Sequence, residues 1–282
     1  MKRKLLWGFV LVAMILLTGW IAWENTHLER TNYEIFSESL PPAFSGFRIA
    51  QVSDLHNAQM GAENETLLAM LKSAQPDMIA ITGDLIDSRR TDTAVALEFV
   101  AEAVKIAPCY YVPGNHEARV AEYDALKEAM VTAGVSVLEN EKVQISCADA
   151  ALTVAGVEDP SFTTDYLLGD AGAVMDGQLR TLAEGEDTFQ ILLSHRPELF
   201  ETYAAWDVEL VLSGHAHGGQ FRLPWIGGLV APNQGLFPQY DGGLFTQAHT
   251  TMVVSRGIGN SIFPFRFCNS PELVVIELKT PQ

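Results

Sequence analysis

The feature that most constrains the fold is an alternation of short apolar runs with segments of helical periodicity, which fills most of residues 48–278. Near-continuous apolar runs are typical of strands covered on both faces, and intervening helical segments are typical of βαβ units, so we expect an α/β fold. The strands are predicted at Arg48–Ser53, Asp77–Thr82, Cys109–Val112, Leu152–Val157, Gln190–Ser194, Val208–Ser213, Met252–Ser255 and Leu273–Leu278. The helices are predicted at Glu63–Gln75, Thr91–Ile106, Glu122–Ala133, Asp176–Ala183 and Pro197–Ala204.

Polar side chains follow five of these strands, at the point where each strand is expected to end. They are Asp54 and His56 ("QVSDLH"), Asp84 ("IAITGD"), Asn115 and His116 ("YVPGNHE"), His195 ("ILLSH"), and His215 and His217 ("LVLSGHAH"). In open α/β sheets, ligands bind at this carboxyl edge. Residues two apart in an extended backbone point to the same side. We therefore expect Asp54 and His56 to face one cavity, and His215 and His217 to face it as well.

These residue types predict a metal site. A single histidine or carboxylate near a strand end is usually an ordinary hydrogen-bonded group. Burying so many unpaired polar groups in a sheet, however, would destabilise the folded protein by several kcal/mol for each group. Coordination of a metal removes that cost, and imidazoles combined with carboxylates suit Zn, Fe, Mn or Co.

The N-terminus predicts a membrane anchor. Met1–Lys4 is basic, and the 19 residues Leu5–Trp23 carry no charge. At about 1.5 Å per residue, a helix of this length nearly crosses a hydrocarbon core of about 30 Å. The run exceeds the apolar core of a signal peptide and no small-residue cleavage motif follows, so we favour an uncleaved anchor over a cleaved signal segment. Lys2, Arg3 and Lys4 should stay in the cytoplasm, which places the remainder on the extracytoplasmic side of the cell membrane.

The rest of the chain is expected to form one domain. We predict a membrane anchor at 1–23, a connector with an edge strand at 24–46, and a catalytic domain at 47–282 that begins at about residue 31 if the edge strand is included.

The composition excludes two kinds of function. The formal net charge of −17 argues against general nucleic-acid binding, because an acidic surface repels phosphates. The three cysteines form no CxxC, so we expect neither a disulfide framework nor a cysteine-based zinc site.

The motifs occur in a fixed order along the chain. They are D-x-H (Asp54, His56), G-D (Gly83, Asp84), G-N-H-E (Gly114–Glu117), S-H (Ser194, His195) and G-H-x-H (Gly214–His217). In this order they resemble the five motifs of the calcineurin-like metallophosphoesterases. The stretches "GHAHGGQ", "VSRGIG", "PFR" and "SPE" resemble the membrane-associated, YkuE-like branch, whose members commonly carry an N-terminal export or anchor segment. The resemblance implies a four-layer α/β/β/α sandwich of two mixed sheets flanked by helices, here preceded by one transmembrane helix.

The same resemblance implies a role for each residue in a metal-dependent phosphohydrolase. Two divalent or trivalent ions (Mn, Fe, Zn or Co) would be held by Asp54, His56 and His217, by Asn115, His195 and His215, and by Asp84 between them. Ions about 3.5–4 Å apart suit in-line displacement and supply a metal-bound hydroxide that attacks phosphorus directly. His116 is the candidate general acid or electrostatic stabiliser of the leaving oxygen.

The substrate is expected to be a phosphomonoester, phosphodiester or pyrophosphate on a small molecule or a lipid. Residues 221–245 are unusually apolar for a Gly/Pro-rich loop, and they either pack on the core or form a rim that accepts a lipid-linked phosphate. Arg222, Arg256 and Arg266 are candidate phosphate contacts.

Two other functions were considered. An amidohydrolase, a different class of metallohydrolase, would carry HxH on its first strand, whereas here HxH comes last. The alternative is a membrane-tethered regulatory protein that binds metal without turnover. Such a protein would be expected to lack a ligand or the acid, and none is missing.

Overall fold

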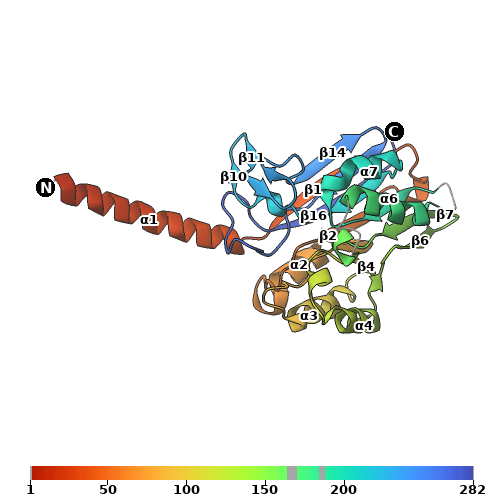
Figure 1. Cartoon of the computed structure of the whole chain (residues 1–282), viewed down its shortest axis with the longest axis horizontal. Helices are drawn as coiled ribbons and strands as arrows, with labels where there is room; N and C mark the ends of the chain where they lie inside the picture. The colour runs from red at the N-terminus through yellow and green to blue at the C-terminus, as the bar shows by residue number, and fades with distance from the viewer. Residues whose placement is uncertain (1, 164–169, 184–187, 282) are drawn as a thin grey trace.

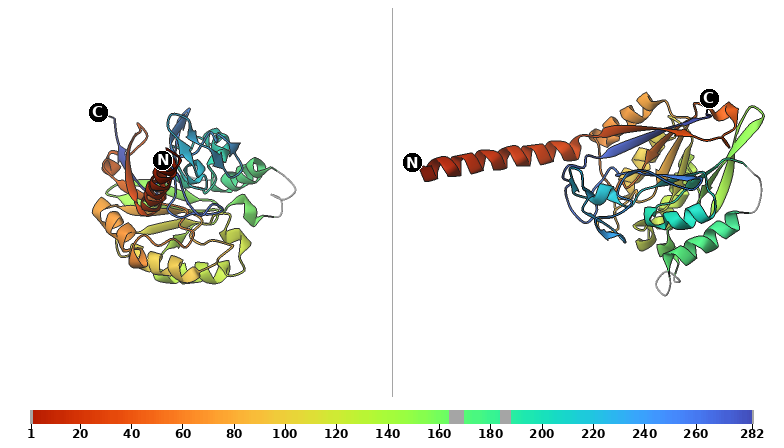
Figure 2. Two further views of the ribbon diagram at one scale, coloured as in Figure 1. Left: turned by 90° about the vertical axis from the view of Figure 1, so that its left-hand side faces the viewer. Right: turned by 90° about the horizontal axis from the view of Figure 1, so that it is seen from above.

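Two six-stranded mixed sheets pack face to face in the computed structural model, which describes residues 2–163, 170–183 and 188–281. Helices cover both outer faces, and a single long helix projects from this body (Figures 1 and 2). The predicted four-layer α/β/β/α sandwich is therefore confirmed.

The first sheet has the strand order β1-β16-β2-β3-β4-β5. Its strands are β1 (Glu29–Phe36), β2 (Arg48–Val52), β3 (Met78–Thr82), β4 (Cys109–Val112), β5 (Ser136–Val137) and β16 (Glu272–Lys279). Strands β2 to β5 are parallel, while β16 runs antiparallel to β2 and parallel to β1. The outer face is covered by α2 (Glu65–Ala74), α3 (Thr93–Ala103) and α4 (Tyr123–Ala133).

The second sheet has the order β14-β15-β9-β8-β7-β6. Its strands are β6 (Glu141–Cys147), β7 (Ala150–Gly156), β8 (Gln190–Leu193), β9 (Leu210–Ser213), β14 (Gly243–Gln247) and β15 (Thr250–Val254). Strands β7, β8, β9 and β15 are parallel, and β6 and β14 are antiparallel strands at the two edges. Its outer face packs against α6 (Ala171–Leu182) and α7 (Phe200–Ala205).

The apolar character of the strands follows from this layering. Every residue of β3 is buried: Met78 and Ala80 belong to the core between the two sheets, whereas Ile79 and Ile81 belong to the core beneath α2 and α3. Because both faces of the strand are covered, its side chains cannot alternate between apolar and polar. All eight predicted strands are present, with small shifts at their ends.

Two regions differ from the sequence-based expectation. Strand β6 was not predicted, because it lies at an edge and five of its seven residues are exposed, which gives it a polar sequence. Residues 221–245, expected to be a loop, contain two small hairpins and the start of β14. The hairpins are β10 (Arg222–Leu223) with β11 (Gly227–Gly228), and β12 (Val230–Ala231) with β13 (Gly235–Leu236).

The projecting helix α1 spans Lys2–Thr26. It has 25 residues, a mean hydropathy of 2.3 in its most apolar window, and no buried residue in that window. Its length and composition are sufficient to cross a membrane. Only at its last turns does α1 meet the body, where Glu24 is buried.

Candidate metal centre

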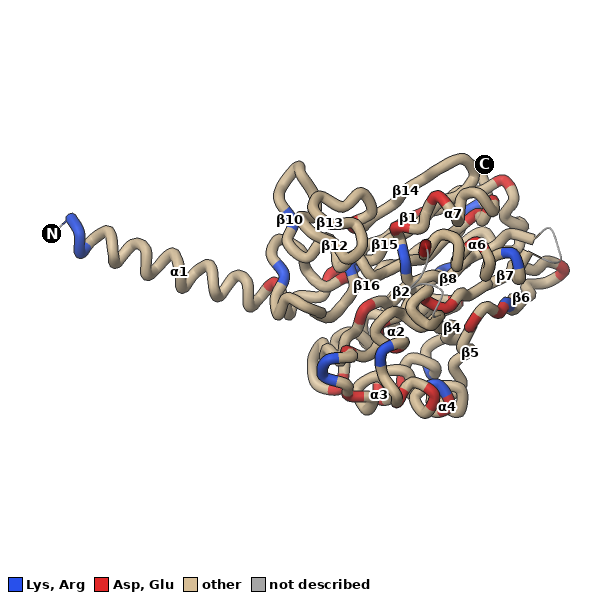
Figure 3. Tube along the Cα trace, in the orientation of Figure 1, with Lys and Arg blue, Asp and Glu red and all other residues tan. Residues whose placement is uncertain are grey.

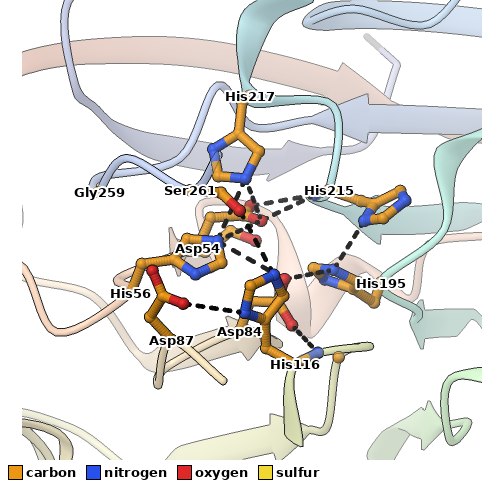
Figure 4. A network of polar contacts seen from close by, with 12 residues as sticks. Asp54, His56, Asp84, Asp87, His116, His195, His215, His217, Gly259 and Ser261 are labelled. Carbon is orange, nitrogen blue, oxygen red and sulfur yellow. Dashed lines mark hydrogen bonds and ion pairs between the residues drawn. The ribbon is translucent and has the colours of Figure 1, made fainter. Parts of the chain in front are cut away.

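The fold brings the residues predicted for the site to one place. Asp54 follows β2, Asp84 follows β3, and Asn115 and His116 follow β4 of the first sheet; His195 follows β8, and His215 and His217 follow β9 of the second sheet. All are buried. Figure 4 shows the two aspartates and the five histidines around a common space at this edge of the sandwich. The residues predicted from the sequence thus lie close together in the fold.

The backbone reason for this convergence was predicted wrongly. Asp54, His56, Asp84, His215 and His217 all have positive φ, between 46° and 65°. Left-handed backbone is uncommon for residues other than glycine, and it concentrates at functional sites. The side chains therefore converge because the chain turns tightly after each strand, and not because of the alternation of an extended strand.

One group of ligand atoms comprises Asp54, His56 and His217. The Nε2 atoms of His56 and His217 lie 3.2 Å apart, and Asp54 Oδ1 lies 3.8 Å and 3.5 Å from them. Asp54 also accepts hydrogen bonds from the backbone N–H of His215 at 3.1 and 3.2 Å, which fixes its carboxylate. Three donor atoms that lie this close can bind one cation.

A second group comprises Asp84, His195 and His215. His195 Nε2 lies 3.2 Å from Asp84 Oδ2 and 3.1 Å from His215 Nδ1. Asp84 Oδ2 also lies 3.6 Å from His56 Nε2 in the first group. Asp84 is therefore the carboxylate within reach of both groups.

The polar groups in this space fit a metal. The buried side-chain oxygen of Asn115 and Nδ1 of His56 have no hydrogen-bond partner. An unpaired buried donor or acceptor is costly, and Asn115 lines the same cavity as Asp84 and His215. Carboxylate, amide and imidazole atoms together are ligands for transition metals such as Zn, Fe and Mn.

Protonation of the histidines is controlled by burial. Burial lowers the pKa of His56 to about 3, and it holds the pKa values of His215 and His217 well below their usual range. Neutral imidazoles keep the lone pair that a metal requires. Burial alone would also lower the pKa of His195, but the Asp84 carboxylate outweighs it and raises that pKa to about 10. A cation bound by the same two groups would compete with this proton.

Hydrogen bonds behind the ligands orient them. His195 Nδ1 lies 2.8 Å from the carbonyl oxygen of Thr82, to which it can donate, so Nε2 remains free to face Asp84. Such contacts fix the ring tautomer at metal sites. Glycines provide the necessary space: a Cβ on Gly114 would lie 2.3 Å from Asp84 Oδ1, and one on Gly214 would lie 1.9 Å from Ser53 Oγ.

Glu117 is a positioning residue to which sequence reasoning gave no role. Its carboxylate is fully buried and accepts hydrogen bonds from the backbone N–H groups of Asp84 (2.9 Å), Gly114 (2.8 Å) and Ile86 (3.2 Å). Burial, with a contribution from Asp84, raises the pKa of Glu117 to about 8. The side chain thereby ties together the loops that follow β3 and β4. Its place in the G-N-H-E motif was the available signal.

His116 lies at the mouth of the site. Its Nδ1 accepts a hydrogen bond from the backbone N–H of Ser88 at 3.0 Å, so the neutral ring carries its proton on Nε2. Nε2 lies 3.3 Å from Ser261 Oγ. The His116 ring also packs edge-on against His56, with the centroids 4.5 Å apart. The ring can therefore donate a hydrogen bond from Nε2 beside the group of Asp54, His56 and His217.

The arginines at the site are not those expected from the sequence. Arg222 pairs with Asp241, and Arg256 pairs with Glu29 and Glu272. Arg266 is fully buried, donates to the carbonyl oxygens of Arg256 and Gly259, and lies 3.4 Å from His217 Nδ1. A cavity of about 210 Å³ over the ligand atoms is lined instead by Arg89, Arg119 and Arg196.

The chain is similar to several known proteins along most of its length. It is 31% identical over 270 residues to an uncharacterized metallophosphoesterase, YkuE of Bacillus subtilis, covering 93% of this chain and 90% of that one. It is 26% identical to the phosphodiesterase YaeI of Escherichia coli, covering 92% and 89% of the two chains. A transmembrane protein with a metallophosphoesterase domain from Danio rerio is 27% identical, over 87% of this chain and 56% of its own length.

A solved structure and a family model agree with these similarities. The crystal structure of TT1561 of Thermus thermophilus matches the fold with a TM-score of 0.52 at 15% identity, over 76% of this chain and 91% of that one. The family model for calcineurin-like phosphoesterases matches residues 47–219, which contain every predicted ligand. The chain therefore belongs to the calcineurin-like phosphoesterase family, and it is a metal-dependent phosphohydrolase.

Proposed function

We propose that this protein is a dinuclear phosphoesterase that hydrolyses a phosphomonoester, phosphodiester or pyrophosphate carried on a lipid. The observation that carries the dinuclear assignment is the pair of buried ligand groups that share Asp84. One ion would be held by Asp54, His56 and His217, the other would be held by Asn115, His195 and His215, and Asp84 would serve both. Two ions bound there (Mn, Fe, Zn or Co) would supply Lewis-acid activation of the phosphoryl group and of water.

The chain's own residues supply the remaining chemistry. His116 would donate a hydrogen bond from Nε2 to the leaving oxygen and stabilise its developing charge, because the Ser88 N–H that occupies Nδ1 leaves the proton on the ring nitrogen facing the cavity. Arg89, which pairs with Asp87, and Arg119 line the same cavity and would attract the phosphate oxygens. Glu117 holds the Asp84 loop in place through backbone hydrogen bonds.

A second cavity supports a substrate with an apolar part. It has a volume of about 150 Å³ and shares His217, Pro232, Ser261 and Ile262 with the cavity over the ligands. Its other walls come mainly from small and apolar side chains: Ala216, Val230, Ala231 and Phe263, together with Gln220. A phosphate at the ligand atoms would thus have an apolar compartment beside it, which suits an acyl or isoprenoid group.

The placement of the protein follows from α1. We propose that residues 1–23 form a single membrane span, that 24–46 connect it to the body, and that 47–282 are the catalytic domain. Lys2, Arg3 and Lys4 precede the apolar run, so the positive-inside rule places them in the cytoplasm and the catalytic domain on the extracytoplasmic side.

Metal analysis of the full chain in detergent tests the dinuclear assignment. After loading with Mn²⁺, the wild type should retain two ions per chain and hydrolyse a bis-aryl phosphodiester. Asp84→Asn should lose both ions and turnover, since one carboxylate serves both groups. Asp176→Asn, which changes a partly exposed aspartate on α6, is the matched control and should behave as the wild type.

Two outcomes would count against the proposal. Two ions retained by Asp84→Asn would refute the bridging role of this residue. A wild type that holds metal but hydrolyses neither phosphomonoesters, phosphodiesters nor pyrophosphates would support the regulatory alternative.

A further inference from the structure

Six large apolar side chains are exposed on the loops beside the catalytic cavity. They are Trp225, Ile226, Leu236, Phe237, Ile262 and Phe263, with exposed fractions from 41% to 102%, and we call them the apolar collar. Leu223 and Phe265, on the same loops, are 36% and 40% exposed. Within the described part of the chain after α1, the remaining large apolar side chains exposed to this degree are Phe36, Val131 and Leu244, which are scattered. A concentrated apolar surface of this kind indicates an interaction site.

The collar is attached to the end of α1 by a continuous series of contacts. The ring of Trp20 on α1 packs edge-on against Phe267, with the centroids 5.2 Å apart. Phe267 accepts a hydrogen bond from the backbone N–H of Arg222, at the start of the β10–β11 hairpin that carries Trp225. Phe221, next to it, packs against Phe263 at 5.2 Å. The collar and the last turns of α1 therefore belong to one packed unit.

The join between α1 and the body is specific. The buried carboxylate of Glu24 accepts the backbone N–H groups of Cys268 (3.0 Å) and Asn269 (2.8 Å). The Asn25 side chain accepts from the N–H of Arg266 and donates to its carbonyl oxygen. Four hydrogen bonds within one helical turn fix the direction of α1, so the helix determines which face of the body lies nearest the membrane.

The charge distribution favours a membrane on the same face. The chain contains 35 Asp and Glu residues, yet residues 210–271 contain a single carboxylate, that of Asp241. Arg222 pairs with it at 3.0 Å. Figure 3 shows the loops around β10, β12 and β13 almost without acidic residues, in contrast to the rest of the body. The part of this strongly acidic protein that adjoins α1 would therefore not be repelled by anionic headgroups.

We propose that the apolar collar inserts into the interfacial layer of the bilayer that α1 crosses, and that the catalytic cavity opens directly onto this membrane surface. The proposal rests on the membrane placement of α1. Trp20 and Trp23 near the end of α1 mark the depth of the interface, because tryptophan is enriched there. Ile262 and Phe263 belong both to the collar and to the apolar cavity, so a lipid could pass from the bilayer to the ligand atoms without crossing water.

Depth measurements on the full chain in nanodiscs test this inference without measuring activity. Exposed Cys147 and partly exposed Cys268 are changed to serine; Cys109 is buried, and burial raises its pKa to about 12, so it does not react with labels. Single cysteines are then introduced by Trp225→Cys and Ile262→Cys and labelled with a polarity-sensitive fluorophore. Leu16→Cys in α1 is the positive control, and Val131→Cys on α4, 53% exposed, is the matched negative control.

Lipid-borne nitroxides should quench the labels at 225 and 262 about twofold or more relative to the label at 131, as expected for side chains in the headgroup region. Leu236→Cys on the second hairpin provides a further site if either variant fails to fold. Quenching at 16 but not at 225, 236 or 262 would overturn the collar while leaving the membrane placement intact. Absence of quenching at 16 would overturn both.

Discussion

The Glu117 carboxylate permits a quantitative test of how the loops at the site are held. It is fully buried and satisfies three backbone N–H groups. Leaving one buried donor unpaired costs about 1–3 kcal/mol. Glu117→Ala would leave three donors unpaired, which approaches the total stability of a typical domain, about 5–15 kcal/mol. We therefore expect Glu117→Ala to fold poorly.

Glu117→Gln is the sharper perturbation. The amide oxygen can still accept from Asp84 and Gly114, while the amide nitrogen faces the N–H of Ile86 and cannot accept from it. One lost acceptor costs about 1–3 kcal/mol. At about 2–4 °C per kcal/mol for a domain of this size, Tm should fall by about 2–12 °C.

Thermal unfolding in detergent at one scan rate, followed by tryptophan fluorescence, measures this difference. Glu102→Gln on α3 is the matched control, because its half-exposed side chain pairs only with Lys105 among the contacts the structure records. A Glu117→Gln variant whose Tm matches those of the wild type and the control would refute the argument that Glu117 secures these loops.

Three further predictions concern the site. His116→Gln should lower turnover by about 10²–10³-fold with unchanged metal content, since the ring stabilises the charge on the leaving oxygen; near-normal turnover would remove it from the mechanism. Gly214→Ala places a Cβ 2.4 Å from Asp54 Oδ2, so it should destabilise the protein by about 1–3 kcal/mol and reduce metal retention. Gly177→Ala on α6, where an added Cβ would meet nothing within 4 Å, is the control and should leave stability and metal retention unchanged. Equal Tm values for the Gly214→Ala and Gly177→Ala variants would contradict this reasoning. Chelation should lower Tm and Mn²⁺ should restore it, because an ion that binds only the folded state stabilises it; a Tm insensitive to chelation would argue against a metal in this space.

The sequence was sufficient to predict the core strands, and its resemblance to a known family predicted the four layers. Strands covered on both faces have nearly uniform apolar sequences, so β2, β3, β8 and β9 were recognisable without the structure. The side chains at their ends were then conspicuous, because a buried histidine or aspartate is unusual next to such a run. Strand β6 lacked this signal, since only Val143 and Ile145 pack on the core and its other residues are exposed.

Details that depend on tertiary contacts could not be predicted. Nothing local indicates that Asp54 and His215 adopt left-handed backbone, because the turns are stabilised by partners distant in the chain, such as the bond from the His215 N–H to Asp54. The same limitation applies to arginines. Arg266 resembled a phosphate ligand in the sequence, yet it is fully buried and supports the loop beside His217.

The strand order of the first sheet has a consequence for biosynthesis. β16, the last strand in chain order, lies between β1 and β2 and pairs with both (Figure 1). During vectorial synthesis, α1 and the early strands emerge first, but β1 has no neighbour within its sheet until residues 272–279 leave the ribosome. In a nascent chain, β1 therefore stays unpaired within its sheet, and the core between the sheets lacks the β16 side chains Val274, Ile276 and Leu278, until these residues have left the ribosome.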